Sequence, residues 1–203
     1  DRYGTQSMVG FNRRYYSVFR KGLELIKKHG NLLGLAVEGH ERFWKIACRD
    51  LTSEIRESWI YANSTHTIDL LRYFGGELRS ISVLSRSLIE KKGDQFVASF
   101  EFESGALGTY SSHWWSPGGW SVTLYGEGVT VIFKPLEGGF WLDKDFNRFE
   151  IEPDEVDSCF KPGFYAQLDA FCEKIRHNQL KWPGQDLSDV LMTMKLVEKF
   201  VCT

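Results

Sequence analysis

The segment from residue 78 to residue 151 repeatedly shows the two-residue period of a β-strand, which points to a fold built around a large sheet. Residues 95–103 alternate between apolar and polar side chains, and the apolar ones are Phe96, Ala98, Phe100 and Phe102. Short turns separate this strand from others predicted at residues 106–115, 120–125, 129–133, 140–142 and 149–151. Because connections this short usually join neighbouring antiparallel strands, the sequence predicts an antiparallel meander.

Helical periodicity precedes and follows this region. The sequence predicts, in order, a short strand at residues 8–11, a helix over 18–30, a strand within 32–48, a loop over 49–58 that allows one helical turn, and a helix over 63–75. Two helices close the chain, with apolar stripes formed by Phe164, Leu168, Phe171, Cys172 and Ile175 and by Leu187, Val190, Leu191, Met194, Val197 and Val201. The expected fold class is α+β, in which helices pack on one face of a mostly antiparallel open sheet, as a single domain over residues 1–203.

The composition excludes several classes of protein. With 203 residues and 42% hydrophobic side chains, the chain can bury a core, which excludes a disordered or fibrous protein. The 25 Lys and Arg residues nearly balance the 27 Asp and Glu residues, so neither a nucleic acid nor an anionic membrane is expected as a partner. No apolar stretch is long enough to span a bilayer. Four dispersed cysteines, Cys48, Cys159, Cys172 and Cys202, favour a reducing compartment, and we expect a cytoplasmic protein.

Several nucleotide-binding and catalytic motifs are absent from the sequence. There is no GxGxxG opening a helix and no GxxxxGK followed by Ser or Thr, so the chain is not expected to bind a dinucleotide cofactor by itself. The HExxH and GxSxG motifs are absent too. Neither His29 nor His40-Glu41 has the spacing of metal ligands, and no metal site is expected.

The most suggestive group of polar residues lies on the predicted helix over residues 63–75. Helical spacing places Asn63, His66, Asp69 and Tyr73 along one side of it, directed away from the core. With Asn63, Ser64 or Thr65 as the N-cap, His66 falls in the first turn. The positive end of the helix dipole disfavours a charged imidazole there, so His66 is expected to be neutral and able to act as a general base. The alternative is a helix-start histidine bonded to a loop, with Asp69 as its surface partner.

Two other groups offer binding chemistry. Arg13 and Arg14 carry guanidinium groups that match phosphate or carboxylate, although a solvated pair that forms salt bridges is the favoured interpretation. Trp114, Trp115 and Trp120 could stack on sugar rings. A role in filling the sheet face or a dimer interface is favoured for these tryptophans.

An ordered set of segments resembles a known family. The segments are FNRRY at residues 11–15, HTIDLLRYFGG at 66–76, FEFESGALG at 100–108, and the pairs Gly119-Trp120 and Tyr125-Gly126. Together they resemble the C-terminal domain of the glucose-fructose oxidoreductase and inositol dehydrogenase family (Gfo/Idh/MocA). The resemblance implies a C-terminal α+β domain like that of glyceraldehyde-3-phosphate dehydrogenase, whose open sheet forms the oligomer interface. It also implies an N-terminal Rossmann domain outside this chain that binds NAD or NADP, which would account for a sequence that starts at Asp1.

The resemblance makes His66 the catalytic histidine of the family, which accepts the proton of a sugar or polyol hydroxyl as hydride leaves for the nicotinamide. The sequence departs from the family at two points. The family often has an Asp four residues before this histidine, where this chain has Ala62, and the adjacent Asn63 can orient a hydroxyl but cannot take a proton. A lysine that the family carries in its Rossmann domain is not in this sequence.

The first hypothesis is therefore the substrate-side domain of an NAD(P)-dependent oxidoreductase, inactive alone, that acts on a sugar, polyol or nucleotide-sugar hydroxyl. In it His66 is catalytic, and the substrate-binding residues are Asn63, Asp69, Arg13 and Tyr73. The alternative is a non-catalytic carbohydrate-binding or scaffolding module in which Trp114, Trp115 and Trp120 bind the ligand.

We also expect a homo-oligomer, at least a dimer, formed through the open sheet face. Helices on one side of the sheet cannot cover all of its apolar side chains, among them Val97, Leu107, Trp115, Val129 and Val131.

Overall fold

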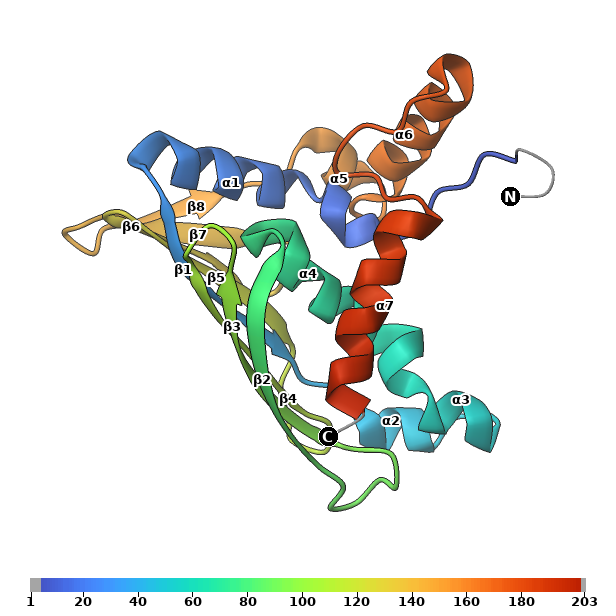
Figure 1. Cartoon of the computed structure of the whole chain (residues 1–203). Coiled ribbons are helices and arrows are strands. Elements are labelled where there is room, and N and C mark those ends of the chain that lie inside the picture. The colour runs from blue at the N-terminus through green and yellow to red at the C-terminus, as the bar shows by residue number, and fades with distance from the viewer. Residues whose placement is uncertain (1–4, 202–203) are drawn as a thin grey trace.

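The computed structural model describes residues 5–201 and shows the expected α+β fold (Figure 1). The strands are β1 (Leu32–Gly39), β2 (Leu78–Arg86), β3 (Gln95–Phe102), β4 (Leu107–His113), β5 (Trp120–Gly126), β6 (Val129–Phe133), β7 (Gly139–Leu142) and β8 (Arg148–Ile151). The helices are α1 (Ser17–His29), α2 (Phe43–Ala47), α3 (Ser53–Glu57), α4 (Thr65–Gly75), α5 (Glu155–Cys159), α6 (Phe164–His177) and α7 (Leu187–Val201), with the 3-10 helix η1 (Asn12–Tyr15) and the π-helix η2 (Ile60–Ser64). They lie on one side of the sheet and leave its other face open.

All eight strands belong to one sheet, in the order β2-β3-β4-β1-β5-β6-β7-β8. The predicted meander is interrupted, because β1 lies between β4 and β5 and separates two strands that a short turn connects. β1 is antiparallel to β5 but parallel to β4, which is the single parallel pair of the described sheet. The sequence could not show this arrangement, since it depends on pairing between segments about 80 residues apart.

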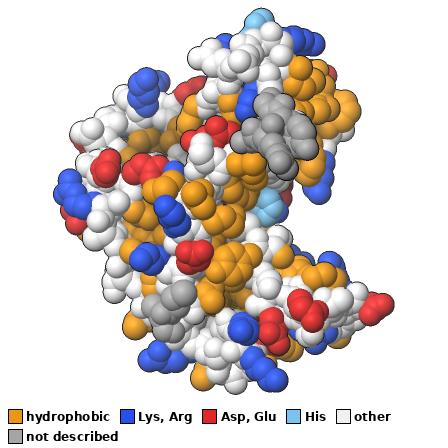
Figure 2. Space-filling model, turned by 45° about the vertical axis from the view of Figure 1, so that its right-hand side comes forward, with side chains coloured by type: hydrophobic (Ala, Val, Ile, Leu, Met, Phe, Trp, Pro, Cys, Tyr) orange, Lys and Arg blue, Asp and Glu red, His pale blue; other side chains and the backbone are white. Residues whose placement is uncertain are grey.

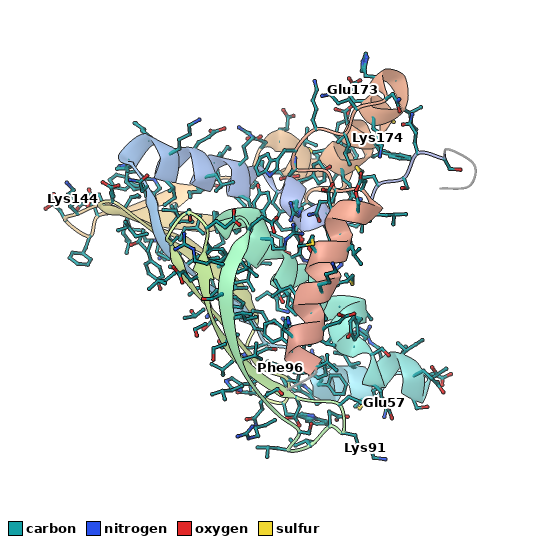
Figure 3. All side chains as sticks on the ribbon, in the orientation of Figure 1. Glu57, Lys91, Phe96, Lys144, Glu173 and Lys174 are labelled. Atoms are coloured by element: carbon teal, nitrogen blue, oxygen red, sulfur yellow. The ribbon has the colours of Figure 1, made fainter. Side chains whose placement is uncertain are left out.

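The alternation of β3 decides which side of the sheet forms the core. Phe96 and Phe102 are buried, and Phe96 points toward the helical layer in Figure 3. Val97, which follows Phe96 in β3, faces the open side of the sheet, as does Leu107 of β4. Val129 and Val131, which we expected to be uncovered, are instead buried in the core.

Two local predictions were wrong. Residues 8–11 form no strand, and the Val9 N–H donates instead to the carbonyl of Gln185, which lies outside the sheet. The strand predicted within residues 32–48 ends at Gly39, and α2 follows. The aromatic and β-branched residues of α2, which favour a strand locally, are used in this helix to contact the core. The helical turn that the sequence allowed within residues 49–58 is present as the short helix α3.

The last long helices differ in how far they are covered. α7 packs against α4 and buries Val190 and Val197 of its predicted stripe, whereas Leu187 and Leu191 are exposed. No residue of α6 is buried, so its stripe of Phe164, Leu168 and Ile175 is open to solvent. Figure 2 shows hydrophobic side chains over the part of the molecule that carries α6, and a hollow between this part and the one below it.

Other expectations concern the termini, the cysteines and the membrane. Asp1 and Cys202 lie outside the described residues. Cys48, Cys159 and Cys172 are free thiols. No helix in the described part of the chain is long and apolar enough to cross a membrane.

Candidate functional site

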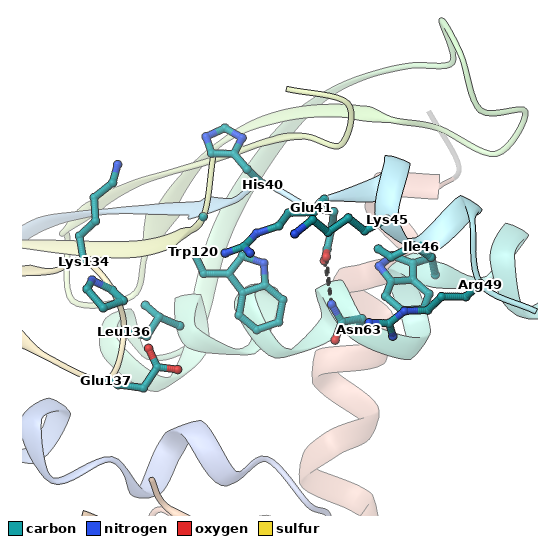
Figure 4. A pocket seen from close by; sticks show the side chains of 14 residues that line it. His40, Glu41, Lys45, Ile46, Arg49, Asn63, Trp120, Lys134, Leu136 and Glu137 are labelled. Atoms are coloured by element: carbon teal, nitrogen blue, oxygen red, sulfur yellow. Dashed lines mark hydrogen bonds between the residues drawn. The ribbon is translucent and has the colours of Figure 1, made fainter. Parts of the chain in front are cut away.

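A cleft of about 680 Å³ lies at one end of three neighbouring interior strands, where β1 ends, β5 begins and β6 ends (Figure 4). These three chain segments meet because β5 runs antiparallel to both β1 and β6. The loop after β1 and helix α2 form one wall, and residues 134–137 form another. Asn63, in the last turn before α4, contributes to the lining.

Glu41 is a buried acid in this wall, with 4% of its surface exposed. The Asn63 side-chain nitrogen donates hydrogen bonds to both Glu41 carboxylate oxygens, at 3.1 and 3.0 Å, and the Ser64 hydroxyl donates at 2.8 Å (Figure 4). Burial raises the pKa of Glu41, and the hydrogen bonds from Ser64 and Asn63 oppose that rise. The amide nitrogen of Asn63 therefore fixes the cleft wall.

Arg13 connects the cleft with His66. Its guanidinium carbon lies 4.4 Å from the centre of the Trp120 ring, which lines the cleft, and one of its nitrogens donates to Asn12 Oδ1 at 3.3 Å. Burial lowers the pKa of Arg13, against the attraction of nearby acidic groups that include Glu137 and Glu41. Arg13 is half-buried and forms no salt bridge among residues 5–201, and it places a positive charge close to both the tryptophan and the histidine.

His66 carries a neutral imidazole at ordinary pH. Burial, and then the charge of Arg13, lower the pKa of His66 to about 4. Phe11 packs edge-on against the ring at 5.3 Å, and His66 Nδ1 is buried without a hydrogen-bond partner among the described residues. The neutral state agrees with the expectation from the sequence, but its main cause is burial.

The helix dipole is not the cause, because α4 does not start freely at its first turn. The π-helix η2 leads directly into α4, and the Thr65 N–H donates to the Ile60 carbonyl. No side chain caps α4, so the cap predicted at Asn63, Ser64 or Thr65 is wrong. Amide groups that would otherwise attract negative charge at a helix start are thus used inside a continuous helical segment.

Asp69 and Tyr73 do not share the polar line predicted for them. Asp69 is buried, and its carboxylate accepts hydrogen bonds from Arg14 Nε at 2.6 Å, Arg14 Nη2 at 2.9 Å and Thr193 Oγ1 at 3.0 Å. Tyr73 is also buried, and its ring stacks on Trp182 at 5.2 Å. Both side chains point into the helical layer, so their assignment to a substrate site with His66 is corrected: they hold helices together.

The three tryptophans differ in what they contact. Trp114 is buried and stacks on Phe43 at 4.9 Å, while Trp115 donates from Nε1 to Glu90 at 3.2 Å. Only Trp120 of the three lines the cleft. Trp114 therefore has the packing role favoured from the sequence, whereas Trp120 is placed where it could contact a ligand.

The structure brings Asn63 and Trp120 into the cleft and places His66 beside it through Arg13, outside the lining itself. Sequence reasoning missed Glu41 and the basic residues of the α2 wall, which are Arg42, Lys45 and Arg49. Their spacing of three and four residues is a helical signal, which the prediction of a strand concealed. Within residues 5–201, no group of three or more potential ligands could hold a metal ion.

The family comparison matches part of the chain. Residues 43–132 match the model of the GFO/IDH/MocA C-terminal domain, a range that includes α2, α4 and strands β2 to β6 up to Ile132. No curated protein matches the sequence.

Solved structures show the same fold. A dehydrogenase from Chromobacterium violaceum superposes with a TM-score of 0.80 at 21% identity, over 98% of this chain and 61% of that one. Levoglucosan dehydrogenase in complex with NADH and L-sorbose gives 0.74 at 12% identity, over 95% and 62%. A UDP-N-acetylglucosamine 3-dehydrogenase from Acidithiobacillus ferrooxidans gives 0.73 at 12%, over 94% and 59%.

The chain thus spans about three fifths of the length of these structures. At these identities the superpositions establish the fold, while the family model rests on the sequence itself. Residues 43–132 are therefore similar in sequence to the C-terminal domain of the GFO/IDH/MocA family, and the chain shares its fold with these dehydrogenases.

Proposed function

We propose that this chain is the substrate-side domain of an NAD(P)-dependent oxidoreductase that acts on a hydroxyl group of a sugar, polyol or nucleotide sugar. The observation that carries the proposal is His66, a neutral imidazole with an unpaired buried nitrogen, three residues from the cleft-lining Asn63. A neutral imidazole can accept the proton that an alcohol loses on oxidation. The fold shared with levoglucosan dehydrogenase, which was solved with NADH and L-sorbose, supports this class of substrate.

We assign the cofactor to a domain outside this chain. The sequence has no glycine-rich dinucleotide fingerprint, so a dinucleotide does not fit the described residues in the usual way. The exposed apolar stripe of α6 and the cavity of about 580 Å³ beside it, lined by Phe160 and Leu168, support a further domain that covers them. Hydride chemistry belongs to that domain, whereas this chain supplies the proton acceptor and the substrate cleft.

The departure at Ala62 defines how His66 must work. With Ala62 at this position, no carboxylate one turn earlier raises the pKa of His66, and Arg13 acts in the opposite direction. His66 therefore stays neutral over the whole range above about pH 4. It needs no deprotonation step before it accepts the proton of the substrate.

The test is His66→Asn in the protein joined to its cofactor-binding domain. Turnover should fall by about 10²- to 10⁴-fold, the usual contribution of a positioned general base, while KM changes much less. His29→Asn is the matched control, because His29 is exposed, hydrogen-bonds to the Leu25 carbonyl of its own helix and does not line the cleft. An unchanged turnover for His66→Asn would make the histidine structural and would refute its role as the proton acceptor.

Titration of the 203-residue chain alone with NADH, followed by nicotinamide fluorescence, tests the assignment of the cofactor. We expect no saturable binding. Tight binding would contradict the assignment to a separate domain and would require a dinucleotide site within this chain.

A further inference from the structure

The cleft beside His66 carries a concentration of positive charge that the chain as a whole lacks. Arg42, Lys45 and Arg49 occupy one face of α2 and its flanking residues, and all three line the cleft. Figure 4 labels Lys45 and Arg49 on this wall. The full sequence has a net charge of −2, so these cations are a local feature. All three side chains are exposed, and within residues 5–201 none of them forms an ion pair.

Acidic groups of the lining do not cancel this charge. Glu41 is buried and its two oxygens already accept hydrogen bonds from Asn63 and Ser64. Glu137 is exposed on the other wall, next to Lys134, whose ammonium lies 3.0 Å from Glu38. One free carboxylate thus faces three unpaired cations, which leaves the α2 wall with a net positive charge.

The remaining lining suits a sugar ring. Trp120 presents an indole between the two walls, and Trp59, Ile46 and Leu136 add apolar surface. Aromatic faces stack on the apolar faces of sugars, and a volume of about 680 Å³ lies within the usual range for small-molecule sites. The cleft therefore combines an apolar platform, an amide at Asn63 and a cationic wall.

We propose that the cleft binds an anionic sugar derivative, with its phosphate or carboxylate held by Arg42, Lys45 and Arg49 and its ring on Trp120. Guanidinium groups bind phosphate and carboxylate oxygens through paired hydrogen bonds, and an ammonium adds a further donor. A neutral sugar or polyol would leave these three cations without partners. That this ligand is the substrate rests on the function proposed above, whereas its binding to the cleft does not.

Binding to the 203-residue chain tests the proposal directly. The probes are glucose 6-phosphate, glucuronate, glucose and NADPH, which separate a sugar phosphate from a sugar acid, a neutral sugar and a cofactor phosphate. Calorimetry gives the affinities, and tryptophan fluorescence reports on the cleft because Trp59 and Trp120 line it. The variants are Arg42→Gln, Arg49→Gln and the double variant. Lys144→Gln is the control, because Lys144 lies in the loop between β7 and β8, far from α2 (Figures 1 and 3).

We expect glucose 6-phosphate or glucuronate to bind at least 10-fold more tightly than glucose. Each single variant should lose about 10-fold of that affinity, the double variant more, and Lys144→Gln none, since a charge-assisted hydrogen bond contributes about that factor. Added salt should weaken binding in the wild type more than in the double variant.

Three results would overturn the proposal: glucose binding as tightly as the acidic sugars, acidic sugars binding equally to the double variant, or saturable binding of NADPH alone. The proposal would also be overturned if none of the four probes bound. The outcome is independent of the His66→Asn experiment. If the intact protein binds acidic sugars but has no oxidoreductase activity, the cleft assignment holds and the proposed function is refuted. If the intact protein turns over neutral sugars only, the proposed function holds and the cleft assignment is refuted.

Discussion

Replacing Asp69 distinguishes a structural carboxylate from a substrate-binding one. Asp69 joins α4 to η1 and α7, because it accepts two hydrogen bonds from Arg14 and one from Thr193. Only 1% of the Asp69 side chain and 6% of the Arg14 side chain are exposed. Asp69→Asn keeps the size of the side chain and removes its charge, so that the Arg14 guanidinium stays buried without a counter-ion.

The magnitude follows from that burial. Removing one partner of a buried ion pair typically destabilises a protein by about 3–5 kcal/mol, since the remaining charge has lost its hydration and its partner. A typical domain has a free energy of unfolding of about 5–15 kcal/mol, so the loss would be a large part of the total. An exposed pair behaves differently, because water replaces the lost partner at a cost of about 1 kcal/mol or less.

Urea unfolding followed by tryptophan fluorescence measures this difference. Arg79→Gln serves as the exposed control, since Arg79 and Glu101 are 58% and 38% exposed. The double variant Arg14→Met/Asp69→Leu removes both charges and should be more stable than Asp69→Asn, so the argument remains testable even where the single variant does not fold. A loss for Asp69→Asn no larger than that of the exposed control would refute the reasoning and return Asp69 to the candidate binding residues.

Three further perturbations have defined outcomes. The folded protein holds the pKa of His66 at about 4, below its ordinary 6.5, so the unfolded chain takes up the proton first as the pH falls. The stability that depends on neutral His66 is therefore complete above pH 6.5 and is lost between pH 6.5 and about 4. His66→Asn should flatten urea-unfolding stability across that window, and an unchanged curve would contradict the depressed pKa. Gly39→Ala should cost about 1–3 kcal/mol, because its new methyl group would meet the buried Tyr110 hydroxyl and Thr67 Oγ1, whereas Gly138→Ala enters open space; equal stabilities would be inconsistent with this close approach. We expect a homodimer through the open sheet face, where Leu84, Val97 and Leu107 are exposed, and Leu107→Lys should dissociate it; light scattering that gives only the 23.5 kDa monomer for the wild type would count against it.

Local periodicity was enough to predict most of the elements. The alternation of Phe96 and Phe102 around exposed Val97 identifies β3 and its buried face, because a strand places successive side chains on opposite sides. The apolar stripes of α1, α4 and α7 are visible in the sequence because a helix brings residues three and four positions apart to one face. The position of β1 between β4 and β5 leaves no such trace, since it depends on long-range pairing that no local pattern encodes.

In the candidate site too, local sequence patterns predicted some features, while others depend on long-range packing. His66 could be singled out by its segment, and its neutral state was predicted, yet the cause was assigned to a helix start that the continuous η2–α4 segment does not provide. Its pKa depends instead on burial and on Arg13, which is distant in the sequence. The basic wall of α2 was missed because Phe43, Trp44 and Ile46 have strand-forming character, whereas in the structure Phe43 and Ile46 pack against the core from a helix.

Arg13 and Arg14 show why adjacent identical residues could not be assigned separately from the sequence. They lie on the 3-10 helix η1, in which consecutive side chains point about 120° apart. Arg14 therefore points inward to Asp69, while Arg13 points to Trp120 and raises the positive potential at His66. One arginine stabilises the helical layer and the other sets the electrostatics of the cleft. The η1 geometry, which separates the two side chains, is therefore a determinant of the site.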